Sequence, residues 1–408
     1  MLYGYLTLLV LRLHFHTAQC IGFVPLRFNK QLQTFQISRW LTVWSHALAL
    51  TLLCAYPYVY VILLTGIRYP KLTLVNYLVW MQCSLHCVNI ALIYYHLLPA
   101  RPVIRDIFNG FVQLFRTLNG AGCHRWKGKS TKKNVLKLAL KMILCDTLLC
   151  ALFVLYFGQF FIHDGDIQSQ ILWSLNIFSV WQSAIFTNLI VVTLIIGVHF
   201  FEILNHRLSL YIGQMRAPAC HLKQLRRQIS TYDALKSVQR NHHLVTSNVK
   251  SFIHLQRPAD TVSNKLLVIS FRYNAPTQIF YAYTSIVQDI KNDVDVPLGT
   301  YMSSILFAVF EAIQFYYIVS ASSEITEEVR PADKQAEKTG VLLNEFLPTD
   351  PNPRVERCIE SFAIELLHED FKINNCGMYD VDYTLMFSMI ATITSYLIML
   401  VQFQLAEI

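Results

Sequence analysis

The fold is decided by residues 170–203, which read QILWSLNIFSVWQSAIFTNLIVVTLIIGVHFFEI. Glu202 is the single charged residue in this run. A helix needs roughly 20 apolar residues to cross a hydrocarbon core about 30 Å thick, so the run is long enough to span a membrane. Comparable runs occupy about 40–65, 74–98, 136–161, 265–288, 298–321 and 384–405. We therefore predict an all-α membrane protein with seven transmembrane helices.

Composition supports this prediction. Hydrophobic residues make up 54% of the 408 residues and charged residues 15%, whereas soluble domains carry roughly 25% charged residues. The chain has no phosphate-binding loop and no nucleophile motif, so we expect no enzyme and no cofactor. Cys83, His86 and Cys87 have no fourth ligand in view, and we expect no metal site there.

The basic residues are distributed very unevenly between alternate loops. Lys and Arg number four before the first span, eight in 99–133 and nine in 204–263. The opposite loops carry only Arg68, Lys71 and Lys291. Cytoplasmic loops are enriched in basic residues, so we predict a cytoplasmic amino terminus and an extracellular carboxyl terminus. This asymmetry accounts for the net charge of +8 and argues against nucleic-acid binding.

Between the sixth and seventh spans, the segment 322–383 is rich in charge. Its apolar residues recur at helical spacing, which predicts an amphipathic helix that needs a cytosolic partner. These residues are Val355, Cys358, Ile359, Phe362, Ala363, Leu366 and Leu367.

The last span carries a stripe of polar residues. Ser388, Thr392, Ser395, Met399 and Gln402 follow spacings of 4, 3, 4 and 3, which place them on one helical face. Two interpretations are open at this point. The stripe either packs against other helices in the bilayer or faces water, as in a pore shared between subunits.

In this same span the sequence 395–403, SYLIMLVQF, resembles the carboxyl-terminal signature of the insect gustatory receptor family. The family pattern is Thr-Tyr, five hydrophobic residues and Gln-Phe, and Ser395 replaces the Thr while keeping its hydroxyl. Upstream, the sequence 377–382, GMYDVD, resembles the family's lead-in to this helix. The signature positions are Gly377, Asp382, Ser395, Tyr396, Gln402 and Phe403. Length, helix number and topology agree with the family along the whole chain.

The resemblance implies a tetrameric, ligand-gated cation channel, formed alone or with other gustatory receptor subunits, that binds a small tastant. It implies the plasma membrane of gustatory neurons, including dendrite, axon and cell body. It also implies four regions: the cytoplasmic segment 1–39, helices one to six at 40–321 with an outer ligand pocket, an inter-subunit anchor at 322–383, and a pore helix at 384–408. The residues it assigns to the pore are Ser388, Thr392, Ser395, Met399, Gln402 and Phe403, of which Phe403 packs against the neighbouring helix.

For the ligand pocket we select aromatic and polar residues in the outer halves of helices two to six, because small ligands are usually held in such cavities. They are Trp80, Tyr156, Trp181, Gln182, Tyr281, Phe307, Phe310, Glu311 and Gln314. Any one of these aromatics could instead serve packing or an interfacial belt. Few of them are charged, which suits a plant secondary metabolite better than carbon dioxide. A sugar would want more hydrogen-bonding residues than these outer helix halves offer, so we favour a bitter tastant, with the sugar type as the alternative.

The ionisable residues within the spans include Asp146, Arg272 and Glu311. Such residues are functional candidates by default, and pairing of Arg272 with one of the two acids is the simplest structural expectation. Two other classes of protein remain as alternatives. A G-protein-coupled receptor would need the amino terminus outside, and a transporter would show two related halves.

Overall fold

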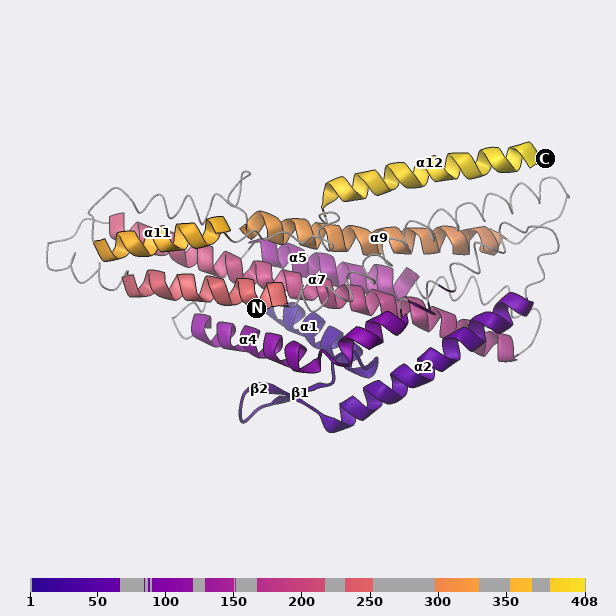
Figure 1. Cartoon of the computed structure of the whole chain (residues 1–408), viewed down its shortest axis with the longest axis horizontal. Coiled ribbons are helices and arrows are strands. Elements are labelled where there is room, and N and C mark those ends of the chain that lie inside the picture. The colour runs from indigo at the N-terminus through magenta and orange to yellow at the C-terminus, as the bar shows by residue number, and fades with distance from the viewer. Residues whose placement is uncertain are drawn as a thin grey trace.

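The computed structural model describes residues 2–66, 84, 87–88, 90–119, 129–149, 151, 167–216, 232–251, 298–329, 353–368 and 382–407. Figure 1 shows an elongated bundle whose long helices run roughly along the longest axis. The elements are α1 (Leu2–Cys20), β1 (Leu26–Asn29), β2 (Thr34–Ile37), α2 (Arg39–Gly66), α4 (Arg101–Asn119), α5 (Lys129–Leu140), the π-helix η1 (Lys141–Leu149), α7 (Ile167–Arg216), α9 (Leu298–Val329), α11 (Pro353–His368) and α12 (Tyr383–Glu407). Residues 90–97 and 232–251 are also helical.

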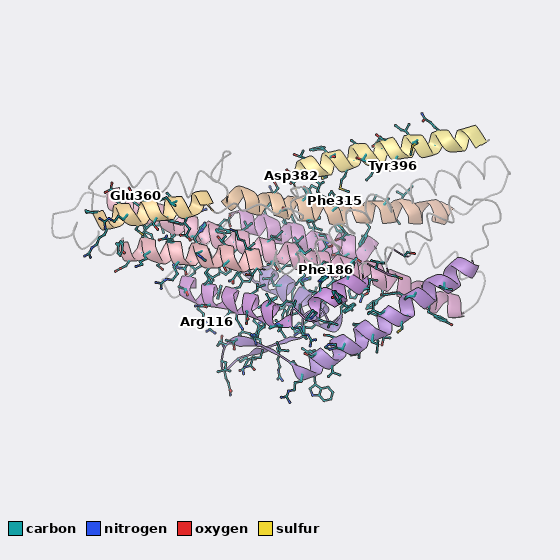
Figure 2. All side chains as sticks on the ribbon, in the orientation of Figure 1. Arg116, Phe186, Phe315, Glu360, Asp382 and Tyr396 are labelled. Carbon is teal, nitrogen blue, oxygen red and sulfur yellow. The ribbon has the colours of Figure 1, made fainter. Side chains whose placement is uncertain are left out.

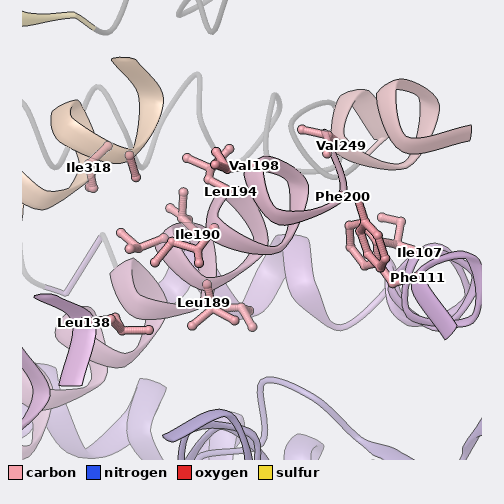
Figure 3. Packing of buried hydrophobic residues seen from close by; sticks show 14 of the residues in the cluster. Ile107, Phe111, Leu138, Leu189, Ile190, Leu194, Val198, Phe200, Val249 and Ile318 are labelled. Atoms are coloured by element: carbon pink, nitrogen blue, oxygen red, sulfur yellow. The ribbon is translucent and has the colours of Figure 1, made fainter. Parts of the chain in front are cut away.

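Helix α7 forms the centre of the bundle. It is 50 residues long and packs against α1, α2, α5 and α9. Among the described residues, Trp181–Tyr211 is long and apolar enough to cross a membrane, with a mean hydropathy of 2.2. Figure 3 shows its apolar residues between Leu138 of α5 and Ile318 of α9. Because other helices surround α7, its apolar residues form the core instead of facing lipid.

The amino-terminal segment packs onto this bundle through α1 and a β-hairpin. Strands β1 and β2 pair antiparallel, with Phe28 opposite Phe35. The loop that follows α1 turns at Gly22, where φ is +82°, and a Cβ there would lie 2.9 Å from the Cα of Ser45. Only glycine fits this close approach to α2 without strain.

Helix α4 is amphipathic and runs beside the hairpin (Figure 1). Its buried residues recur every three or four positions, which places them on one face. They are Ile104, Ile107, Phe111, Leu114 and Leu118. Pro102 lies in the first turn, where a missing backbone N–H costs nothing.

Helix α11 confirms the predicted amphipathic helix. Val355, Cys358, Ile359 and Phe362 are buried, and the helix lies next to residues 232–251. Gln239 donates to Glu365 Oε2 at 2.8 Å across this contact. The apolar face thus finds a partner between the fourth and fifth predicted spans; its cytosolic location stays a prediction.

The predicted spans correspond to the helices with some differences. Helices α2, α7, α9 and α12 cover 40–65, 170–203, 298–321 and 384–405, whereas 265–288 lies outside the described residues. The runs at 74–98 and 136–161 are described in part. We did not predict α1, the hairpin or α4, all of which lie in segments treated as connecting regions.

Candidate functional site

The polar stripe of α12 is exposed along most of its length. The side chains of Ser388, Ser395, Met399 and Gln402 are exposed, and that of Thr392 is half-buried. On another face, Met389 and Ile393 are buried where α12 contacts α9. Figure 2 shows Asp382 at the start of α12 and Phe315 on the neighbouring α9. A single chain therefore covers one face of α12 and leaves the polar one uncovered.

Hydrogen bonds within α12 satisfy the hydroxyl protons of Thr392 and Ser395. Thr392 Oγ1 donates to the carbonyl oxygen of Ser388 at 2.8 Å, and Ser395 Oγ donates to that of Ala391 at 3.0 Å. Serine and threonine hydroxyls can donate to the carbonyl four residues earlier in a helix. Their oxygen lone pairs remain available, so this face can accept hydrogen bonds or coordinate a cation.

Two signature positions have clear local roles. Asp382 caps α12, because its Oδ1 accepts from the backbone N–H of Leu385 at 2.9 Å. Tyr396 is 38% exposed on the helix surface. Gly377 and the side chain of Phe403 lie outside the described residues.

Two of the residues predicted to bind ligand lie at the start of the buried part of α7. Trp181 is half-buried, 6.1 Å from the ring of Phe178. Gln182 is 1% exposed and uses both ends of its amide. Its Oε1 accepts from Tyr56 at 2.9 Å, and its Nε2 donates to the hydroxyl of Tyr94 at 2.9 Å.

Two more predicted ligand residues lie on α9. Phe310 and Gln314 are both buried, and four residues separate them, so they share one helical face. Trp80, Tyr156 and Tyr281 lie outside the described residues, as do the side chains of Phe307 and Glu311.

Gln314 belongs to a buried polar cluster that joins three helices. Asp146 of η1 is at its centre: its Oδ1 accepts from Gln314 Nε2 at 2.6 Å, and its Oδ2 accepts from Asn188 Nδ2 of α7 at 2.6 Å. Lys141 Nζ lies 3.3 Å from Asp146 Oδ1 and donates to Asn188 Oδ1 at 2.5 Å. We call Lys141, Asp146, Asn188 and Gln314 the buried polar cluster.

The π-helical geometry of η1 makes the ion pair of this cluster possible. Lys141 and Asp146 are five residues apart, which separates them around a regular α-helix. In a π-helix the backbone hydrogen bonds join residues five apart and each turn is wider than in an α-helix, so the two side chains come close enough to meet. Thr147 shows the same spacing, since its Oγ1 donates to the carbonyl oxygen of Met142 at 2.8 Å.

Asp146 has Lys141 as an ionic partner. Arg272 and the side chain of Glu311 lie outside the described residues, so the expected pairing of Arg272 with one of the two acids stays a prediction. Lys141 and Asn188 were missed because their contacts depend on a π-helix and on packing between helices far apart in sequence. The spacing of five between two opposite charges inside a predicted span was the signal that could have revealed the pair.

The cluster retains one unused buried acceptor. Within the described part of the chain, Gln314 Oε1 is buried and has no hydrogen-bond partner. Such an atom normally costs about 1–3 kcal/mol unless something binds it. The described residues contain no group of three or more His, Cys, Asp or Glu side chains able to hold a metal ion.

Known proteins resemble this chain at several levels. A family model described as 7tm Chemosensory receptor matches residues 11–407. Gustatory receptor 28b of Drosophila melanogaster is 29% identical over 156 residues, which cover 37% of this chain and 32% of that protein. Gustatory and pheromone receptor 33a of the same fly is 30% identical over 84 residues, which cover 19% of this chain and 18% of that protein. The matched stretches thus span no more than 32% of either relative.

Solved structures match over nearly the full length. The insect olfactory receptor OR5 from Machilis hrabei has a TM-score of 0.62 at 12% identity and covers 98% of this chain and 99% of its own. The same receptor in complex with eugenol has a TM-score of 0.53 at 14% identity with the same coverage. The predicted fold class, a seven-transmembrane helical membrane protein, is thereby confirmed. Because the family model covers residues 11–407, the chain belongs to the 7tm chemosensory receptor family.

Proposed function

We propose that the protein is a subunit of a tastant-gated, non-selective cation channel in the plasma membrane of insect gustatory neurons. The observation that carries this proposal is the exposed polar stripe of α12. An otherwise apolar helix that presents Ser395 and Gln402 away from its own bundle needs water or a second chain against that face. Family membership and the gustatory relatives support the sensory role.

The three faces of α12 fit a helix at the axis of a fourfold assembly. One face, with Met389 and Ile393, packs on the protein's own bundle. A second is apolar and exposed, with Phe387 at 66% and Ile398 at 54% exposed. We propose that this second face contacts α12 of the next subunit. The polar stripe then lies between the two contacts and faces the axis.

In this arrangement the stripe would form successive rings around the ion path. Four Gln402 amides would provide carbonyl oxygens that replace part of a cation's hydration shell. The hydroxyl oxygens of Thr392 and Ser395, whose protons are bonded within the helix, would do the same deeper in the pore. Phe403 would pack against the neighbouring helix and support the Gln402 ring.

For the tastant we propose a pocket that includes Trp181, Phe310 and Gln314. The two aromatics offer apolar contact area, and Gln314 Oε1 offers a buried acceptor for a hydroxyl or amine. Gln182 already has both ends of its amide bonded to tyrosines. Few hydrogen-bonding groups are then left for a sugar, so we favour a bitter, mainly apolar metabolite with one donor group.

Expression in oocytes with a panel of tastants, alone and with other gustatory subunits, tests this function. We expect inward cation currents for apolar tastants and about a tenfold or greater rise in half-maximal concentration for Phe310→Ala, because a buried aromatic contact contributes a few kcal/mol. Surface labelling controls for folding. Normal surface expression without current to any tastant in any subunit combination would contradict the channel assignment.

A further inference from the structure

The amino-terminal quarter of the chain carries positive charge without compensation. Residues 1–105 contain eight Lys or Arg residues and no Asp or Glu. The first acidic residue, Asp106, lies 2.8 Å from Arg105 in an exposed ion pair. The basic residues ahead of α4 therefore have no acidic partner nearby in sequence, and an anion from outside the chain can neutralise them.

The β-hairpin and the first residue of α2 place three of these basic residues at the surface. Arg27, Lys30 and Arg39 are exposed, and none forms an ion pair within the part of the chain that the structure describes. Arg27 lies on β1, Lys30 in the turn, and Arg39 at the first residue of α2.

The hairpin is held firmly, so these charges are presented by a fixed scaffold. Phe35 exchanges two hydrogen bonds with the Asn109 side chain of α4, at 2.7 and 3.2 Å. Arg116 Nη2 donates to the carbonyl oxygen of Gln33 at 2.6 Å. The ring of Phe35 also packs against Phe108, with centroids 5.3 Å apart. A surface ordered in advance loses little entropy when a ligand binds.

Exposed aromatic residues adjoin the basic ones. Trp40 is 86% exposed and Trp44 50% exposed, and they lie four residues apart on one face of α2 with Val43, which is 62% exposed. Tryptophan is enriched where a membrane meets water, because its ring suits the level of the lipid headgroups. Trp44 is fixed in place, since its Nε1 donates to the carbonyl oxygen of Cys20 at 2.8 Å.

The position of the hairpin and of the start of α2 agrees with a location at the level of the lipid headgroups. The hairpin and the start of α2 lie on the outer edge of the bundle, on the opposite side from α12 (Figure 1). Helices α2 and α12 begin at about the same position along the long axis of the molecule and run in the same direction (Figure 1). In the proposed orientation, this position corresponds to the cytoplasmic boundary of the membrane.

We propose that Arg27, Lys30, Arg39, Trp40 and Trp44 form a docking surface for anionic phospholipid headgroups of the cytoplasmic leaflet. We call these five residues the lipid-docking surface. The tryptophans enter the headgroup region, and the guanidinium and ammonium groups bind phosphate and carboxylate oxygens. Charge is the selective element, because a zwitterionic lipid offers the same apolar contact without net negative charge.

The test uses the full chain, purified in detergent, and measures thermal unfolding with added short-chain lipid. A ligand that binds the folded protein raises its unfolding temperature. We expect phosphatidylserine to raise that temperature more than phosphatidylcholine does, and high salt to remove the difference. In Arg27→Gln/Lys30→Gln/Arg39→Gln, apparent affinity for phosphatidylserine should fall about a hundredfold, since each basic residue near an anionic surface contributes roughly fivefold.

A matched control removes the same charge elsewhere. Lys133→Gln/Arg240→Gln/Arg357→Gln alters three exposed residues outside the lipid-docking surface and should keep wild-type binding. The variant Arg27→Lys/Arg39→Lys should also bind phosphatidylserine, because it keeps the charge.

Equal phosphatidylserine affinity in the wild type and in Arg27→Gln/Lys30→Gln/Arg39→Gln would overturn the proposal. An equal response to free inositol phosphate, which would indicate a soluble anion as the ligand, would also overturn it. The readout requires no channel current, so it is independent of the proposed channel function.

Discussion

At the scale of single residues, Lys141 and Asp146 are the least expected feature of the bundle. Both are almost completely buried, and removing two charges from water costs several kcal/mol per ion. Asn188 and Gln314 offset that cost by bonding both carboxylate oxygens. The hydrogen bonds of this pair to Asn188 and Gln314 therefore tie η1 to α7 and α9 at one point.

Removing one charge of this pair should destabilise the protein strongly. Lys141→Met leaves Asp146 buried without its ionic partner, and we expect a loss of roughly 3–5 kcal/mol in the free energy of unfolding. Lys141→Met/Asp146→Leu should lose less than the sum of the single variants, because neither charge is then stranded. Denaturant-induced unfolding in detergent measures the free energy of unfolding of each variant. The exposed Lys133→Met is the control, and an effect of Lys141→Met no larger than that of this control would contradict the buried pair.

At the scale of elements, three helices meet around His242. Its ring lies 5.0 Å from that of Phe201 on α7 and 5.4 Å from that of Phe362 on α11. Burial, followed by the charges of His243 and Lys250, lowers the pKa of His242 from 6.5 to about 4. The neutral ring is thus the form that packs in this contact.

The lowered pKa predicts an acid-sensitive contact. The folded state favours neutral His242, so its contribution is complete above pH 6.5 and is lost as the pH falls from 6.5 towards 4. The full difference corresponds to roughly 3 kcal/mol. His242→Phe should therefore lose less stability than the wild type over that range, whereas the exposed His206→Gln should behave as the wild type does. Parallel pH profiles of unfolding for all three proteins would refute this role.

Helices were predictable where their apolar residues recurred regularly or formed a long run. The 3.6-residue repeat of Val355, Ile359 and Phe362 predicted α11, and uninterrupted apolar runs predicted α2, α7, α9 and α12. The hairpin was not predicted, because strands of four residues are too short for a clear alternation and Asn109 of a distant helix holds β2. The polar cluster was not predicted, because it depends on a π-helix and on contacts between residues far apart in sequence.

At the scale of the whole molecule, the distribution of basic residues predicts which side of the membrane each loop faces. The charge asymmetry predicts that 99–133 and 204–263 are cytoplasmic. On intact cells, an impermeant thiol reagent should label Gly165→Cys above the background of the native cysteines. It should label Gly128→Cys only after permeabilisation. The reverse pattern would invert the topology and reopen the G-protein-coupled alternative.

The central claim is that the polar face of α12 lines the ion path, and cysteine accessibility during channel opening tests it most directly. Single cysteines at Ser388, Ser395 and Gln402 represent the polar face, and those at Phe387, Ile390 and Ile398 the apolar one. A charged methanethiosulfonate reagent applied with agonist should reduce current through the polar-face variants and leave the apolar-face variants unchanged. Reduction on both faces alike, or on neither while the variants conduct, would contradict a pore along this stripe.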